Sequence, residues 1–347
     1  MFWLDKWRQE MKIDCPMALI INSPIFQSKA YLLQESQLER DDLPGLKKPG
    51  SRLALGCDNQ TSDLHAFTMF DHFYGSGGRI FDTAFIYNHG RGDKYLGDWI
   101  NARNVEEDVI VLGKGAHTPE CEPQYIRPQV LPSLERLQIS KLDIFCLHRD
   151  HPDIPVDEFI DALADIKNEG LVNLIGASNW EMDRFVEARN YAIKNAKEPF
   201  TVLSNNFSLA EMVKPVWPGC VGVNDHYLKY LIEERIMLFP WSSQARGFFI
   251  QKKEIMSNEH FSNPTLDEEM RVWHYEKNLQ RRQVCFEIAQ ERNVQPIQVA
   301  LAYVLHKSKL IFPLIGPRTI FESNSSIQAT QLELTTKELQ ALAQINV

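Results

Sequence analysis

The chain has 347 residues, of which 44% are hydrophobic and 24% are charged, as is typical of a soluble globular protein. Its net charge of −9 argues against nucleic acid or an anionic membrane surface as the main partner. No apolar run approaches the length of a transmembrane helix, and the N-terminus has an early acid, Asp5, and no signal-peptide core, so we expect a cytoplasmic protein. The six cysteines lack any metal-ligand spacing, which favours buried, reduced thiols and predicts no metal site.

Residues 1–50 are expected to be an N-terminal extension of unknown role. Residues 17–24 have the pattern of a strand and turn, and residues 41–50 have the proline, glycine and charge density of a linker.

From residue 51 onward, predicted strands alternate with predicted helices. The strands are expected at 52–57, 80–82, 109–114, 142–148, 171–179, 200–205, 236–242 and 310–316. The helices are expected at 62–74, 94–101, 125–138, 156–168, 182–196, 227–235, 279–292 and 296–306. This alternation predicts an α/β protein with a (β/α)8 TIM barrel over residues 51–347. A doubly wound sheet is the weaker alternative, because no GxGxxG follows any predicted strand.

Two connections are longer than a barrel needs, namely residues 208–226 and 246–278. Both follow predicted strands, so both are expected over the C-terminal mouth of the barrel, where long loops usually bind ligands or act as lids. Their aromatic residues either wall a substrate pocket or pack the loops onto the barrel: Trp217, Phe248, Phe249 and Trp273.

Ionisable residues stand at or after the ends of three consecutive buried strands. Asp82 and Tyr87 follow the second strand, Lys114 ends the third and His148 ends the fourth. Because the C-terminal ends of barrel strands carry the chemistry of this fold, these four residues are the candidate catalytic group.

The four residue types together suit the protonation of an alkoxide. An ammonium near a tyrosine lowers the phenol pKa from about 10, and a carboxylate can hold that ammonium in place. A histidine can donate a hydrogen bond to a carbonyl oxygen as negative charge develops on it. Hydride delivery to the carbonyl would need a nicotinamide cofactor, since no side chain supplies hydride.

The sequence from about residue 51 to 345 resembles the aldo-keto reductases. The resemblance rests on Phe81, Asp82, Thr83, Ala84 and Tyr87, on Gly92, Leu96 and Gly97, on Lys114, on Leu147 and His148, and on residues 176–179, 240–243 and 316–319. It implies Tyr87 as general acid and base, Lys114 and Asp82 as the residues that tune it, and His148 as the donor that orients the carbonyl.

The same resemblance implies where a cofactor, NADP(H) or alternatively NAD(H), would bind. Ser178 and Asn179 match positions that hold the nicotinamide carboxamide, and Trp241 matches the aromatic residue on which the nicotinamide stacks. The pyrophosphate loop is matched by Ser242, Gln244 and Gly247, and the loop for the adenosine 2′-phosphate by Gly316, Arg318 and Thr319. Arg318 offers a fork to a phosphate, and the helix that begins near Thr319 favours an anion.

Three positions depart from the family pattern. Ser204 stands where a glutamine is usual, so Asn205 is expected to take over the carboxamide contact. Ser326 replaces an asparagine near the adenine, and Cys57 replaces a threonine or another small residue on the first strand.

The sequence leaves the substrate and the class of function open. His89, Arg149 and His151 add polar groups beside the four candidates and favour a sugar or another polar aldehyde or ketone. A cofactor-binding regulatory subunit is one alternative, with residues 1–50 as a docking arm. A sugar dehydrogenase working with NAD in the oxidative direction is another.

Overall fold

Parallel strands form a closed barrel at the centre of the molecule. The computed structural model describes residues 38–250 and 271–343. Within them, one eight-stranded sheet has the order β10-β3-β4-β5-β6-β7-β8-β9, and every neighbouring pair is parallel. The strands are β3 (Ala54–Gly56), β4 (Ile80–Asp82), β5 (Ile110–Gly115), β6 (Leu142–Leu147), β7 (Val172–Ala177), β8 (Val202–Leu203), β9 (Met237–Leu238) and β10 (Leu314–Ile315).

Backbone hydrogen bonds between the last two strand regions close the sheet into a barrel. Leu238 donates to Leu310 and accepts from Phe312, and Leu314 donates to the carbonyl of Pro240. An isolated parallel bridge joins Leu238 to Ile311 at the same place. The predicted (β/α)8 barrel is therefore confirmed.

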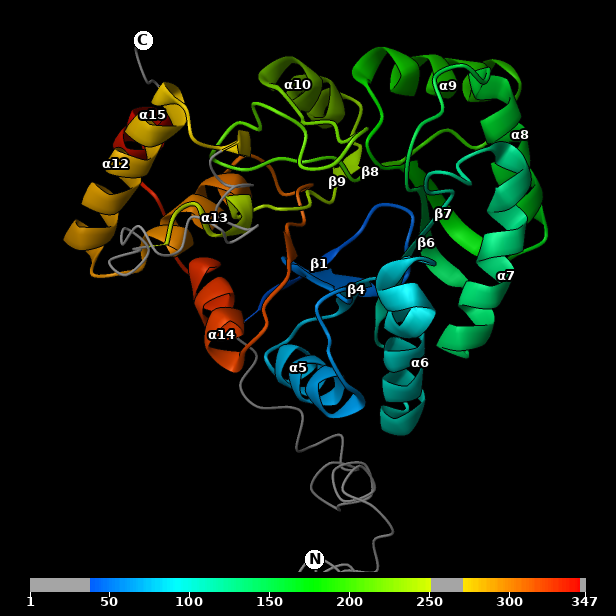
Figure 1. The fold of residues 1–347 in the computed structure, drawn as a ribbon, viewed down its shortest axis with the longest axis horizontal. Coiled ribbons are helices and arrows are strands. Elements are labelled where there is room, and N and C mark those ends of the chain that lie inside the picture. The colour runs from blue at the N-terminus through cyan, green and yellow to red at the C-terminus, as the bar shows by residue number, and fades with distance from the viewer. Residues whose placement is uncertain (1–37, 251–270, 344–347) are drawn as a thin grey trace, which may run out of the picture.

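Helices surround the barrel in a ring that follows chain order, except that the last helix lies beside the one at residues 276–292 (Figure 1). They are α5 (Asp63–Gly75), α6 (Arg91–Arg103), α7 (Ile126–Leu137), α8 (Val156–Asn168), α9 (Met182–Lys194), α10 (Asp225–Glu233), α12 (Glu276–Arg292), α13 (Pro296–His306), α14 (Ile320–Ala329) and α15 (Thr336–Ala343). Short 3-10 turns are η1 (Tyr87–Gly90), η2 (Pro123–Tyr125) and η3 (Ala245–Gly247).

Local sequence signals explain several helix boundaries. Ser62 accepts a hydrogen bond from the backbone of His65 and so caps α5, as the sequence predicts. Helix α13 begins with Pro296 at its first position, where the missing N–H costs nothing, and Gln295 and Gln298 form a capping box. The predicted helix 156–168 coincides with α8, whose apolar face is buried.

A short antiparallel hairpin lies against the barrel base, formed by β1 (Arg40–Asp42) and β2 (Pro49–Ser51). Between its strands, Leu43 is 2% exposed and packs with the inward-facing residues of the strands, and Leu46 packs beside it. Lys48 donates to the carbonyls of Glu106 and Val109 and pairs with Asp143, which holds the hairpin in place. The linker expected at residues 41–50 is therefore wrong, and the boundary expected at residue 50 falls inside β2.

The loops that follow β8 and β9 have their own core. Phe248, Phe249 and Trp273 are buried there against α12 and α13, so these three aromatic residues pack the loops onto the barrel. Trp217 is different, because 49% of its surface remains exposed. Residues 1–37 and 251–270, which include the expected strand at 17–24 and much of the second long loop, lie outside the described residues.

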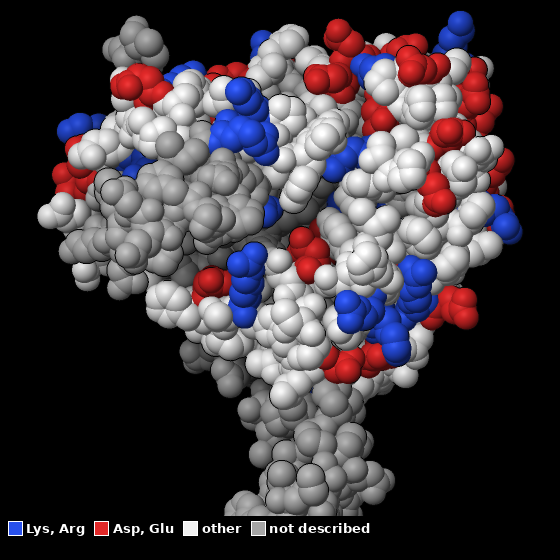
Figure 2. All heavy atoms as spheres, in the orientation of Figure 1, with Lys and Arg blue, Asp and Glu red and all other residues white. Residues whose placement is uncertain are grey.

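Charges of both signs are interspersed over the face seen in Figure 2, with acidic side chains gathered over α8 and α9 at its upper right. The five cysteines in the described ranges are buried and form no disulfide: Cys57, Cys121, Cys146, Cys220 and Cys285. In residues 38–250 and 271–343, no helix is both long enough and apolar enough to cross a bilayer.

Candidate active site

The structure brings the four candidate residues together at the C-terminal mouth of the barrel. Asp82 is the last residue of β4, and Tyr87 opens the η1 turn that follows it. Lys114 lies near the end of β5, and His148 comes directly after β6. The strand order places β4, β5 and β6 side by side, so residues far apart in the sequence meet above neighbouring strands.

Lys114 links the carboxylate and the phenol. Its Nζ forms a buried ion pair with Asp82 and donates to the Tyr87 Oη at 3.4 Å. The side chains of Asp82 and Lys114 are almost fully buried, so the pair is screened little by solvent. This arrangement fixes a positive charge beside the phenol oxygen.

His148 faces the same phenol. Its ring centroid lies 5.7 Å from that of Tyr87, with the rings nearly perpendicular. The His148 backbone N–H donates to the carbonyl of Gly115, which anchors the residue to the end of β5. The buried Nδ1 atom has no hydrogen-bond partner among the described residues, so the imidazole is not committed to a protein carboxylate.

Burial dominates the ionisation of the tyrosine. Burial and the carboxylates of Asp82 and Asp58 raise the pKa of the Tyr87 phenol well above its usual value, while Arg149 lowers it. The sequence predicts the opposite net direction, because it counts the ammonium of Lys114 but not the desolvation of the phenol or the acids beside it. The result is a tyrosine that carries its proton at neutral pH, as a general acid must.

The other two ionisable groups are also shifted by burial. Burial raises the pKa of Asp82 to about 6, although the Lys114 ammonium opposes the rise. Burial, followed by the positive charges of Lys114 and Arg149, holds the pKa of His148 well below its usual value. His148 is therefore a neutral imidazole at pH 7, able to donate a single N–H hydrogen bond.

The expected carboxamide-binding residues form a hydrogen-bonded turn after β7. Ser178 donates to the carbonyl of Ser204, and the Asn179 side chain donates to the carbonyl of His148. The Asn205 amide oxygen accepts from the backbone N–H groups of Asn179 and Trp180, and its NH₂ donates to the carbonyl of Trp180. Asn205 thus holds the turn that carries Asn179, a task that the sequence did not predict.

Ser204 and Trp241 bring β8 and the segment after β9 into the site. The Ser204 hydroxyl donates to the carbonyl of Phe239 and is fully buried. The ring of Trp241 lies 6.4 Å from that of Trp217, in a tilted arrangement, and its buried Nε1 has no hydrogen-bond partner among the described residues. The Arg246 guanidinium lies over the indole of Trp217, 5.1 Å from its ring centroid.

The expected phosphate-binding segments also meet. Ser326 of α14 donates to the Gln244 side chain, which joins the loop after β9 to the helix after β10. Ser242 and Gly247 have positive φ and turn that loop tightly. Thr319 caps α14, and Glu322 accepts from the Arg318 backbone N–H. The main-chain carbonyl of Gly316 is held by Asn59.

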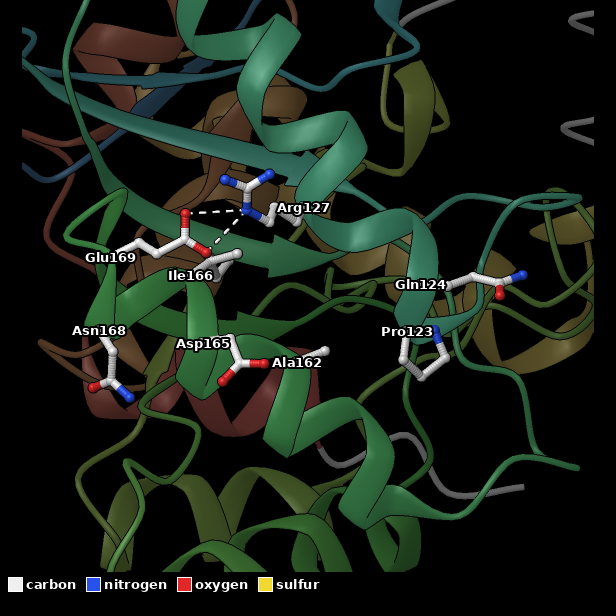
Figure 3. Close-up of a pocket in the computed structure, with 8 residues that line it drawn as sticks. All are labelled: Pro123, Gln124, Arg127, Ala162, Asp165, Ile166, Asn168 and Glu169. Atoms are coloured by element: carbon white, nitrogen blue, oxygen red, sulfur yellow. Dashed lines mark hydrogen bonds and ion pairs between the residues drawn. The ribbon is translucent and has the colours of Figure 1, made fainter.

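A separate groove of about 600 Å³ lies on the outer surface (Figure 3). It runs between η2, the start of α7 and helix α8, and the Arg127–Glu169 ion pair closes one side. None of the four candidate catalytic residues lines it. In the described part of the chain, no group of three or more His, Cys, Asp or Glu side chains could hold a metal ion.

Comparison with known proteins agrees with this geometry. Residues 50–347 match the sequence profile of the Aldo/keto reductase family. The chain belongs to this family. As an aldo-keto reductase it is an oxidoreductase, and the family uses nicotinamide cofactors.

Its relatives include enzymes with aromatic substrates in their names. Norsolorinic acid reductase of Aspergillus flavus is 26% identical over 306 residues, which cover 82% of this chain and 71% of the relative. Aryl-alcohol dehydrogenase [NADP(+)] of Phanerodontia chrysosporium is 25% identical over 309 residues, covering 81% and 76%. A thermostable aldo-keto reductase solved with the inhibitor epalrestat has the same fold, with a TM-score of 0.67 over 88% of this chain and 98% of the other, at 19% identity.

The sequence did not identify some residues that surround the four candidate catalytic residues, here called the tetrad. His117 follows β5 and lies edge-on to His148, with 4.8 Å between ring centroids. Asp58 follows β3 and raises the pKa of Tyr87. Both stand just past strand ends, so the rule that found the tetrad could have found them. Two of the polar residues expected beside the four candidates differ in exposure: His89 is exposed, whereas Arg149 is buried.

Proposed function

We propose that the protein is an NADP(H)-dependent reductase that converts an aldehyde or ketone to an alcohol, with Tyr87 as the proton donor. The observation that carries the proposal is the buried contact of Lys114 with both Asp82 and the Tyr87 Oη, opposite the His148 ring. A protonated phenol held beside a fixed positive charge can give its proton and bear the resulting negative charge.

The chain's own residues divide the work. Neutral His148 donates a hydrogen bond to the carbonyl oxygen and so orients it toward the phenol. Tyr87 then transfers its proton from Oη to the developing alkoxide, and Lys114 stabilises the phenolate that remains. Asp82 keeps Lys114 in place. A bound nicotinamide cofactor supplies the hydride.

The residues present fit such a cofactor. Trp241 is partly exposed, and its buried Nε1 has no acceptor among the residues that the structure describes. Ser178 and Asn179 would hold the carboxamide, with Asn205 and Ser204 supporting them from β8. Ser242, Gln244 and Gly247 would hold the pyrophosphate, and Gly316, Arg318, Thr319 and Ser326 the adenosine end. The exposed Arg318 makes NADP(H) our preferred form over NAD(H).

We further propose an aromatic carbonyl compound as substrate. The rings of Trp217 and Trp241 lie 6.4 Å apart in a tilted arrangement, and the exposed indole of Trp217 offers aromatic surface to a planar ring. The names of the relatives, norsolorinic acid reductase and aryl-alcohol dehydrogenase, support this choice. The sugar or other polar carbonyl favoured by the sequence stays a prediction.

The first experiment compares the wild-type protein with Tyr87→Phe. We expect NADPH oxidation with benzaldehydes to fall at least about 100-fold in the variant, since general acid catalysis contributes about 10²- to 10⁴-fold. Fluorescence titration should show unchanged NADPH binding, because the substitution leaves the cofactor residues intact. Xylose and other sugars belong in the same panel, with both NADPH and NADH.

Each other outcome has a distinct meaning. Activity that survives in Tyr87→Phe would show that another group donates the proton. Tight NADPH binding without turnover of any aldehyde, ketone or sugar would favour the regulatory subunit. Faster oxidation of sugars with NAD than reduction of any carbonyl would favour the sugar dehydrogenase.

A further inference from the structure

Arg149 is a buried cation beside the proposed reacting centre. It follows His148 directly in the sequence, and its backbone N–H donates to the carbonyl of Ala116 after β5. Only 6% of its surface is exposed. The loop after β8 packs on its aliphatic part, since a Cβ placed on Gly219 would lie 3.6 Å from the Arg149 Cδ.

The guanidinium of Arg149 has few acceptors. Its Nη1 donates to the carbonyl of His148 at 2.9 Å, and its Nη2 lies 3.7 Å from the Cys220 Sγ, which is a weak acceptor. Its buried Nε has no hydrogen-bond partner among the described residues. The adjacent carboxylate, Asp150, is engaged by Arg184 instead.

The other buried arginines in the described ranges are better satisfied. Arg103, Arg189 and Arg281 each pair with a carboxylate, from Asp71, Glu234 and Glu211 respectively. Arg52 donates to several backbone carbonyls, and Arg79 donates to two carbonyls and lies 3.9 Å from the Tyr74 ring centroid. Among the buried arginines that the structure describes, Arg149 is the one whose guanidinium has a single oxygen acceptor and does not lie over an aromatic ring.

This unbalanced charge acts on the reacting residues. Arg149 contributes to lowering the pKa of His148 and His117 and opposes the rise in the pKa of Tyr87. An arginine cannot lose its proton to relieve the cost of burial, so a buried guanidinium needs several oxygen acceptors or an anion nearby. Among the described residues, its hydrogen-bond partners are one carbonyl oxygen and one sulfur, with no carboxylate, so the acceptor that its remaining donors lack must come from a ligand.

We propose that Arg149 binds a carboxylate on the substrate, so that the enzyme's substrates are carbonyl compounds that carry an acidic group. The edge of the guanidinium formed by Nε and Nη2 has no oxygen acceptor from residues 38–250 or 271–343, and it matches the two oxygens of a carboxylate. This inference rests on the proposed reductase function and names the substrate class of the same site.

The test uses two aldehydes of similar shape that differ in charge: 4-carboxybenzaldehyde and 4-carbamoylbenzaldehyde. We expect the wild-type enzyme to have a lower KM for the carboxylate. Arg149→Met should raise that KM about 10- to 100-fold, the range for a charge-assisted hydrogen bond, and change the KM of the amide less than about threefold. Arg127→Met, on the outer surface, is the control and should change neither.

Equilibrium binding separates this proposal from the reductase function. Calorimetry would compare 4-(hydroxymethyl)benzoate with 4-(hydroxymethyl)benzamide, in the presence of NADP⁺. Preference for the benzoate that is lost in Arg149→Met supports the carboxylate site even if neither aldehyde is reduced, in which case the reductase proposal would fail alone. Arg149→Lys keeps the positive charge and should retain part of the preference for the benzoate over the benzamide. It replaces Arg149→Met in the comparison if the methionine variant does not fold.

Two results would overturn the proposal. One is equal binding of the acid and the amide by the wild-type protein. The other is an equal fall in kcat for both aldehydes in Arg149→Met, with a shifted pH profile and unchanged KM, because Arg149 would then act on Tyr87 through its field without touching the substrate.

Discussion

His148 is held in a neutral form by its surroundings. Burial and the cations of Lys114 and Arg149 disfavour a second proton on its ring and lower its pKa. A neutral imidazole can donate to a carbonyl oxygen without competing with Tyr87 as the acid. Under the proposed function, these surroundings would give different tasks to two residues that could each donate a proton.

The lowered His148 pKa makes stability depend on pH. In the unfolded chain this histidine has a pKa near 6.5. Below that pH the unfolded state binds a proton on the imidazole, whereas the folded state does not until its own lower pKa is reached. Its contribution to stability is full above pH 6.5 and is lost as the pH falls from there toward the folded pKa, by up to about 1.4 kcal/mol per pH unit. Urea unfolding between pH 7.5 and 5 should show a smaller loss in His148→Asn. Parallel stability curves for the two proteins would contradict this.

Residue identity at strand ends was enough to predict which side chains meet. Asp82, Lys114 and His148 each close or follow a buried apolar run, and parallel strands bring such ends to one mouth. The sequence could not give their ionisation, because desolvation depends on what covers each group. It also could not show that Arg149 is buried without a carboxylate, since this depends on a loop that arrives about 70 residues later.

At the scale of elements, Asn205 joins β8 to the turn after β7. Its amide group satisfies both N–H groups of Asn179 and Trp180 and the carbonyl of Trp180. Asn179 has a positive φ of 61°, a conformation that asparagine tolerates better than most residues. The side chain that would meet the cofactor is therefore positioned by a neighbouring strand.

Removing this amide should destabilise the fold. Asn205→Ala leaves two buried backbone donors without partners, at a cost of roughly 1–3 kcal/mol for each unsatisfied group, while the Trp180 carbonyl keeps the bond from the Tyr227 hydroxyl. Asn195→Ala is the matched control, because the Asn195 side chain is exposed and bonds only its own helix. Chemical denaturation should separate the two variants by at least about 1 kcal/mol. Equal stabilities would mean that Asn205 is dispensable to the turn.

Elements with strong local signals were predicted well. The predicted helices 156–168 and 296–306 match α8 and α13, where an amphipathic pattern or a proline and cap mark the ends. The hairpin β1–β2 was missed because its strands have three residues each, β1 is entirely charged, and β2 contains proline and glycine. Its pairing depends on the barrel base beneath it, which no local pattern reveals.

For the whole molecule, the sealing hairpin and the candidate active site lie at opposite ends of the barrel. The hairpin covers the base with Leu43, while the tetrad and the long loops occupy the mouth. A variant at the base should thus alter unfolding and leave turnover unchanged.

Leu43→Ala tests that separation. Deleting a buried leucine side chain costs about 2–5 kcal/mol, so thermal unfolding should occur at a clearly lower temperature. Leu46→Ala, at a half-buried neighbour, should cost less. The KM and kcat of both variants should match those of the wild-type protein at 25 °C. A Leu43→Ala protein of normal stability would show that the hairpin does not seal the base.

The entry of the chain at Leu38 has a practical consequence. The Leu38 backbone N–H bonds to the carbonyl of Ser76, in the turn that leads into β4 at the base. A bead, a sensor surface or a second enzyme attached directly at Leu38 would therefore hold the barrel by its base. Immobilised in this way, the catalyst would present its open end to the flowing solution.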